Sequence, residues 1–146
     1  MHIEIDQSGK VEMLSHDTII ASSNEKQHCI KIPKEIKREI FYNYKNKIKQ
    51  LNYKLFSIGV YYCIEKYINS YSSIVIDNEY HNKNKLIKDV LVYYIRKKFT
   101  NFNQDIIQFS NIGKKSNAHH IAIETFRGEH KPNEILTQKE IWRLLK

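Results

Sequence analysis

Several residue types that mark common protein classes are scarce in this chain. Its 146 residues include two cysteines, two prolines and four glycines, a composition that excludes a disulfide-stapled secreted domain and a Pro/Gly-rich disordered chain. A membrane-spanning helix needs roughly 20 apolar residues, and the longest apolar stretch, residues 56–64, is interrupted by Ser57 and Gly59. We therefore expect a soluble globular chain with no membrane partner.

Targeting and redox motifs are also missing. The first residues, MHIEIDQSG, lack the charged and then apolar segments of a secretory signal peptide. Cys29 and Cys63 have apolar neighbours and no CxxC spacing, and the histidines show no Cys/His spacing suited to a zinc site. These features predict reduced cysteines and a cytoplasmic location.

Positive charge is what the chain has in excess. Lys and Arg number 24 against 16 Asp and Glu, which gives a formal net charge of +8. Such a surplus attracts polyanions, and nucleic acid, DNA or RNA, is the partner that we expect. Lys83 and Lys85 belong to one of the basic runs that we assign to nucleic-acid contact.

Tyrosines accompany another basic run. Tyr42, Tyr44 and Tyr53 flank the lysines of residues 45–49, and aromatic rings among cations are suited to stacking on unpaired bases. Packing in the core or in a homodimer explains tyrosines at such positions equally well. Both interpretations stay open at this point.

The length and continuity of the chain predict one domain. A chain of 146 residues is long enough to bury a core but too short for two independent cores. It contains no internal repeat and no Pro/Gly-rich linker. We expect the core over about residues 1–128 and a helical extension over residues 129–146.

The first quarter of the chain predicts strands. Residues 2–6 and 10–14 flank the polar turn Gln7-Ser8-Gly9, which is typical of a β-hairpin. Further strands are expected at residues 18–22 and 28–32. An antiparallel meander therefore opens the fold.

Beyond Pro33, which sets φ for a helix start, helices alternate with strands. Residues 74–76 are β-branched and lack alternation, which predicts a central strand buried on both faces. Thr137 and Glu140 form the capping box of a terminal helix. The other expected elements are helices from residue 33 and over residues 51–68, 84–99 and 116–127, and a strand over residues 105–110. The order predicts an α/β fold with a mixed sheet, in which parallel strands continue the meander and helices flank it.

Three acidic residues lie where predicted strands stop. Asp6 ends the first strand, Asp77 ends the central strand, and Glu79 follows two residues later. If the two strands are neighbours and parallel, these carboxylates meet at one edge of the sheet. Carboxylates a few Å apart repel one another, and a divalent cation with oxygen ligands, Mg²⁺ or Mn²⁺, relieves that repulsion. The pattern thus predicts a metal site made by Asp6, Asp77 and Glu79.

The element order and these motifs resemble the ribonuclease H-like superfamily. In that family the first strand carries an Asp followed by a small-residue turn, as Asp6-Gln7-Ser8-Gly9 does here, and the fourth strand ends in a second Asp, as Asp77 does in IVIDNEY. The resemblance covers most of residues 1–128. It implies a Mg²⁺-dependent nuclease, resolvase or related phosphoryl-transfer fold.

One family residue has no counterpart. The family has a Glu on its first helix, and the early turns of the helix around Leu55 carry no acidic residue. Glu65 lies near the far end of that helix, and the length of the following strand places it roughly 15 Å from Asp77. We expect Glu79 to supply the missing carboxylate.

A late helix completes the family's site with an acidic residue or a His. Here His120 and Glu124 are four residues apart and share a helix face, whereas His119 is turned about 100° away. We assign catalytic roles to His120 and Glu124, and a metal-binding role also to Glu124. The residues assigned to nucleic-acid contact on this side are Ser8, Lys114, Lys115 and His119.

Three functions follow as hypotheses. The leading one is a metal-dependent nuclease that hydrolyses phosphodiester bonds through Asp6, Asp77 and Glu79, helped by Glu124 or His120. The second is a nucleic-acid-binding module of the same fold without turnover. The third is a homodimeric interaction protein whose acidic residues are ordinary turn residues.

Overall fold

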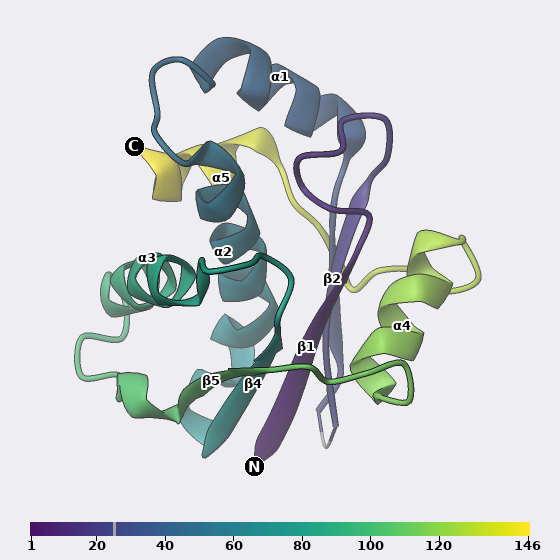
Figure 1. Ribbon diagram of the computed structural model, residues 1–146, viewed down its shortest axis with the longest axis vertical. Coiled ribbons are helices and arrows are strands. Elements are labelled where there is room, and N and C mark those ends of the chain that lie inside the picture. Colours follow the sequence, from purple (N-terminus) through teal and green to yellow (C-terminus); the bar gives the residue numbers. More distant parts are fainter. Residues whose placement is uncertain (25) are drawn as a thin grey trace.

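One mixed sheet organises the molecule, and the computed structural model describes residues 1–24 and 26–146. Within these residues six strands lie in the order β5-β4-β1-β2-β3-β6 (Figure 1). The strands are β1 (His2–Ser8), β2 (Thr18–Asn24), β3 (His28–Ile32), β4 (Ser73–Asp77), β5 (Ile107–Ser110) and β6 (Glu134–Ile135). β2 is antiparallel to both β1 and β3, while β4 is parallel to β1 and β5 to β4. The prediction of an α/β fold, with an antiparallel meander continued by parallel strands, is confirmed.

Helices cover both faces of this sheet. They are α1 (Lys34–Tyr44), α2 (Leu51–Ile64), α3 (Asn84–Arg96), α4 (Asn117–Phe126) and α5 (Gln138–Leu145), with short 3₁₀ helices η1 (Glu65–Ser70) and η2 (Gln104–Ile106). α2 packs on β2 and β3 and also contacts α3 and α5, whereas α4 packs on the other face against β1 and β2 (Figure 1). α2 is apolar on nearly all sides because it is enclosed by these neighbours. The main core therefore lies between the sheet and α2.

The predicted hairpin between residues 2–6 and 10–14 is wrong. β1 continues to Ser8 and pairs with β2, and residues 10–14 form turns without a strand. The carbonyl oxygens of Lys10 and Met13 accept hydrogen bonds from the Lys37 ammonium, at 3.3 and 2.7 Å. Because a side chain from α1 satisfies these backbone groups, the segment needs no strand partner.

β4 is also less enclosed than predicted. Ile74 and Ile76 are buried against the main core, but Val75 on the other face is half-buried. α4 covers β1 and β2 and leaves this part of the sheet uncovered. The predicted 51–68 helix is α2 followed by η1, and the segment expected as a helical extension also adds β6, which pairs with β3. The capping box of Thr137 and Glu140 is confirmed.

Lys37 is the largest buried charge in the core, and its removal is expected to destabilise the fold. Its side chain donates to two loop carbonyls and to the Thr18 hydroxyl at 2.9 Å, and burial lowers its pKa to about 8. Lys37→Met keeps the apolar stem but leaves three acceptors without a donor. We expect a loss of about 2 kcal/mol in the free energy of unfolding, measured by urea denaturation. Lys139→Met, on an exposed position of α5, is the control, and equal midpoints for the two variants would contradict the role of Lys37.

Candidate metal centre

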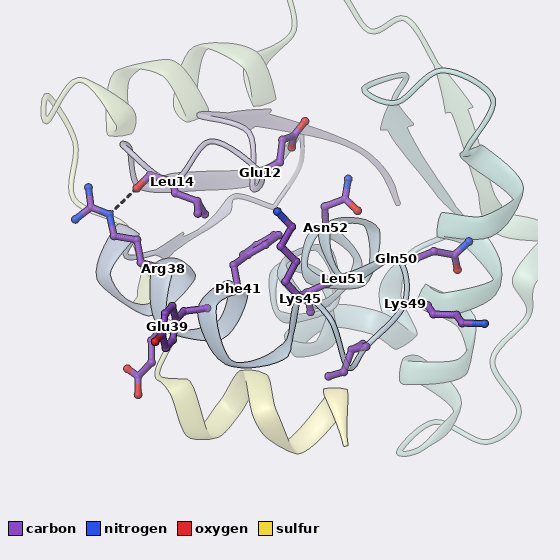
Figure 2. A pocket seen from close by; sticks show the side chains of 12 residues that line it. Glu12, Leu14, Arg38, Glu39, Phe41, Lys45, Lys49, Gln50, Leu51 and Asn52 are labelled. Atoms are coloured by element: carbon purple, nitrogen blue, oxygen red, sulfur yellow. Dashed lines mark hydrogen bonds between the residues drawn. The ribbon is translucent and has the colours of Figure 1, made fainter.

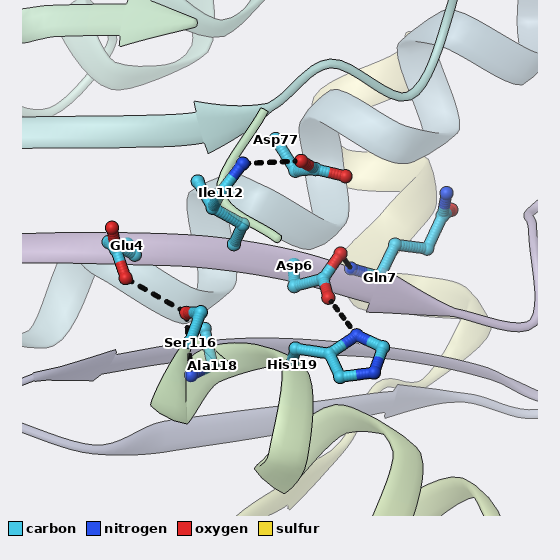
Figure 3. A network of polar contacts seen from close by, with 8 residues as sticks. All are labelled: Glu4, Asp6, Gln7, Asp77, Ile112, Ser116, Ala118 and His119. Atoms are coloured by element: carbon cyan, nitrogen blue, oxygen red, sulfur yellow. Dashed lines mark hydrogen bonds and ion pairs between the residues drawn. The ribbon is translucent and has the colours of Figure 1, made fainter. Parts of the chain in front are cut away.

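The register between β1 and β4 brings the first two predicted acids together. Ile5 pairs with Ile76 across this parallel ladder, so the residues that follow them, Asp6 and Asp77, lie side by side. Side chains alternate along a strand, and since Ile5 and Ile76 face the main core, both aspartates face the side of α4. Figure 3 shows the two side chains on their neighbouring strands.

Glu79 joins this pair from the segment just beyond β4. One carboxylate oxygen each of Asp6, Asp77 and Glu79 lies within 4.8 Å of the others. Asp6 is buried, whereas Asp77 and Glu79 are half-buried and open to solvent. The predicted convergence of these three acids is confirmed. They are the group that we call the carboxylate cluster.

Fixed hydrogen bonds orient the two aspartates. The Gln7 backbone N–H donates to Asp6 Oδ1 at 2.8 Å, and the Ile112 backbone N–H donates to Asp77 Oδ1 at 3.0 Å. His119 Nδ1 lies 2.8 Å from Asp6 Oδ2. Ile112 lies just beyond β5 and His119 lies on α4, so three regions of the chain hold the cluster in place (Figure 3).

Electrostatic repulsion is concentrated on Glu79. Burial, and after it the nearby Asp6 and Asp77, together raise the pKa of Glu79 to about 8, and Lys10 partly opposes them. A carboxyl group in this position holds a proton near neutral pH unless a cation replaces it. The donor set, carboxylate oxygens only, is the one that a hard divalent cation prefers. The residues present thus fit Mg²⁺ or Mn²⁺.

The structure brings His119, not His120, to the cluster. His119 is on the side of α4 that faces β1, while His120 is exposed. Glu124 is half-buried and pairs with His130 at 2.8 Å, and it is not part of the carboxylate cluster. The expected catalytic roles of His120 and Glu124 therefore lack the geometry that they require. The helical spacing separated the two histidines correctly but did not indicate which one faces the sheet.

Glu4 is a residue beside the cluster that the sequence interpretation did not single out. Its Oε1 accepts a hydrogen bond from the Ser116 hydroxyl at 2.8 Å, and Ser116 caps α4 by accepting the Ala118 N–H at 3.2 Å. This contact fixes the start of α4 against β1 and so positions His119. The signal was the alternation along β1, because Glu4 lies two residues before Asp6 and shares its face.

The predicted nucleic-acid contacts lie at separate places around the cluster. Lys114 and Lys115 are exposed in the turn before α4, and Ser8 ends β1. Lys83 lies over the ring of Tyr53, with Nζ 5.6 Å from its centroid. Lys85, at the start of α3, pairs with Asp89 at 3.1 Å. Lysines thus flank the cluster from both the α3 and the α4 sides.

A polar cavity of about 700 Å³ lies beside Glu79. Asparagine side chains line much of it, and they bond to one another: Asn84 Nδ2 donates to Asn78 Oδ1 at 2.8 Å, and Asn78 Nδ2 donates to Asn111 Oδ1 at 3.1 Å. The cluster is therefore reached from solvent through polar surroundings.

No family model, curated protein or solved structure matches the chain. Across residues 1–24 and 26–146, none of the helices combines the length and apolar character needed to cross a bilayer. The side-chain chemistry of the carboxylate cluster and its surroundings is what indicates a function.

Proposed function

We propose that this chain is a metal-dependent nuclease of the ribonuclease H-like class, which hydrolyses phosphodiester bonds in DNA or RNA. One observation carries the proposal: Asp6 on β1, Asp77 at the end of the parallel strand β4, and Glu79 just beyond β4 place oxygens within 4.8 Å of one another. Asp77 ends its strand in the pattern that the family uses, whereas Asp6 lies within β1, which continues to Ser8. The net charge of +8 favours a polyanionic substrate.

The three acids would hold the cation, Mg²⁺ or Mn²⁺. When bound, it supplies positive charge to the phosphate oxygens and lowers the pKa of a water molecule. Asp6 is held rigidly for this role because its two oxygens contact the Gln7 N–H and His119. Glu79 must give up a proton on binding, since its pKa of about 8 keeps it largely protonated at neutral pH.

His119 has two roles in this arrangement. Its contact with Asp6 Oδ2 fixes the orientation of that carboxylate, as outer histidines and carboxylates do around many metal sites. Its ring is also half-exposed next to the cluster, so it can contact a bound substrate. It replaces His120 as the histidine that we assign to the reaction.

A cleavage panel tests the proposal. Single-stranded, duplex, hybrid and branched substrates are incubated with Mg²⁺, Mn²⁺ or EDTA, using wild type and Asp77→Asn. We expect metal-dependent products from wild type and none from Asp77→Asn. Asp105→Asn, an exposed acid on η2, is the control and should behave as wild type. Absence of cleavage by wild type on every substrate, or equal cleavage by Asp77→Asn, would overturn the nuclease.

A second candidate is a nucleic-acid-binding module without turnover. It is favoured by the small size of the cluster, which in the described part of the chain contains three acids and none from α2. Salt-dependent binding of an oligonucleotide with no products in Mg²⁺ or Mn²⁺ would select this function over the nuclease.

A further inference from the structure

A second, larger cavity of about 900 Å³ lies between the loop 9–17, α1 and the turn that precedes α2 (Figure 2). Its walls include the apolar side chains of Leu14, Phe41, Tyr42 and Ile48. We call this cavity the α1 groove. Its volume is in the range of small-molecule sites, and none of its lining residues belongs to the carboxylate cluster.

Tyr42 is the most unusual residue of the α1 groove. It is 91% exposed, although tyrosine buries a large apolar ring wherever packing allows. Phe41 beside it is half-buried and packs against the main core. Tyr42 thus offers an exposed ring in the wall of the groove, and exposed aromatic rings in proteins stack on unpaired bases.

The charges around the groove favour an anionic ligand. Arg38, Lys45 and Lys49 line it, together with Glu12 and Glu39. Figure 2 shows Lys45 pointing across the groove and Glu39 pointing away from it. Glu12 Oε1 accepts the Tyr80 hydroxyl at 2.9 Å, and Arg38 Nε donates to the Leu14 carbonyl oxygen at 2.9 Å. Three cationic side chains and two carboxylates line the groove, which leaves an excess of one positive charge.

The groove is also connected to the carboxylate cluster. Tyr80, whose hydroxyl bonds to Glu12 on the groove wall, follows Glu79 directly in the chain. The same hydroxyl lies 3.4 Å from the side chain of Gln7, the neighbour of Asp6. Lys10 Nζ lies 5.6 Å from the centroid of the Tyr80 ring. The buried Tyr80 and the exposed Lys10 thus lie between the cluster and the groove.

We propose that the α1 groove binds an unpaired segment of the nucleic-acid strand whose phosphodiester lies at the carboxylate cluster. Bases lie against Phe41 and Tyr42, and the phosphates lie toward Arg38, Lys45 and Lys49. Bases within a duplex are already paired and stacked, so only a single-stranded segment presents a free ring face. This inference rests on the proposed nuclease and specifies its substrate as a strand with a single-stranded region beside the cut.

Fluorescence anisotropy in EDTA tests the groove without the metal. The probes are fluorescein-labelled oligo(dT) and oligo(U) of about 12 nucleotides and a blunt duplex of the same length. We expect Tyr42→Ala to weaken binding of at least one single-stranded probe about tenfold, the effect of losing one stacked base, and to leave duplex binding within about twofold. Lys45→Ala should lower the salt dependence of single-strand binding by about one counterion.

Tyr93→Ala is the matched control, because Tyr93 is 61% exposed and has Lys97 Nζ 4.9 Å from its ring centroid, but it lies on α3 away from the groove. Equal affinities of Tyr42→Ala and Tyr93→Ala for both single-stranded probes would overturn the groove assignment. The assignment would also be overturned if sedimentation detected a homodimer of wild type that dissociates in Tyr42→Ala, because a second copy of the chain would then occupy the groove.

The two proposals fail in different ways. If cleavage depends on metal and Tyr42→Ala affects neither binding nor cleavage, the binding role of the α1 groove is rejected and the nuclease proposal is retained. If binding in EDTA depends on Tyr42 but no cleavage occurs in Mg²⁺ or Mn²⁺, the nuclease proposal is rejected and the α1 groove is retained as a binding site for unpaired strands.

Discussion

Asp6→Asn is expected to reduce metal-dependent cleavage by about a thousandfold or more while the fold is retained. The variant keeps the size of the side chain and an oxygen for the Gln7 N–H, but it removes the negative charge at the centre of the cluster. A bound cation contributes several kcal/mol to phosphodiester hydrolysis, and each 1.4 kcal/mol changes the rate about tenfold. The measurement is the initial rate on the best substrate in saturating Mg²⁺.

Two controls separate this effect from general damage. Far-ultraviolet circular dichroism and the unfolding midpoint report whether the fold survives, since Asp6 is buried. Glu124→Gln tests specificity, because Glu124 pairs with His130 outside the cluster. This variant should cleave the substrate at a rate close to that of wild type. Comparable losses in Asp6→Asn and Glu124→Gln would contradict the assignment of the site.

Glu79→Gln is expected to change stability in opposite directions with and without metal. In the folded state the pKa of Glu79 is raised to about 8 from an ordinary value of 4.5. The folded protein therefore binds this proton more tightly than the unfolded chain does, and the associated stability is present below about pH 4.5 and is lost as the pH rises through about 8. The Gln side chain of the variant cannot ionise, so the free energy of unfolding of the variant does not fall as the pH rises through about 8.

In EDTA at pH 8.5 we expect Glu79→Gln to be more stable than wild type by about 3 kcal/mol, the order of magnitude that the shift in pKa gives. Saturating Mg²⁺ should stabilise wild type and leave the variant nearly unchanged. Urea unfolding at pH 5 and pH 8.5, with and without Mg²⁺, measures both effects. The control is Glu39→Gln, at an exposed position of α1. A wild type that is equally stable at both pH values in EDTA would contradict the repulsion within the cluster.

The parts of the site that the sequence predicted depend on local patterns. Apolar runs followed by an acid predicted that Asp6 and Asp77 end strands, which holds for Asp77 but not for Asp6, since β1 continues to Ser8. The pairing of the two parallel strands still brings both acids together. Glu79 followed from its spacing to Asp77. These inferences needed only strand periodicity and one neighbour relation, which the ladder between β1 and β4 provides.

The parts that were missed depend on contacts between distant residues. Residues 10–14 resemble a strand until the Lys37 ammonium, more than 20 positions later, satisfies their carbonyls. The rotation of α4 about its axis follows from its buried face, Ala118, Ala122 and Thr125, which packs on β1 and β2, together with the contact of Ser116 with Glu4. This rotation brings His119, and not His120, to Asp6. Glu124 lies outside the cluster and pairs instead with His130, beyond the end of α4, at 2.8 Å.

Binding of Mn²⁺ measured by electron paramagnetic resonance tests the carboxylate cluster most directly, because free and bound Mn²⁺ give different signals whether or not a substrate is known. We predict saturable binding of Mn²⁺ to wild type at pH 8, competition by Mg²⁺, unchanged binding in Glu124→Gln and loss of the saturable component in Asp6→Asn. Identical titrations of wild type and Asp6→Asn would show that Asp6, Asp77 and Glu79 do not hold a cation.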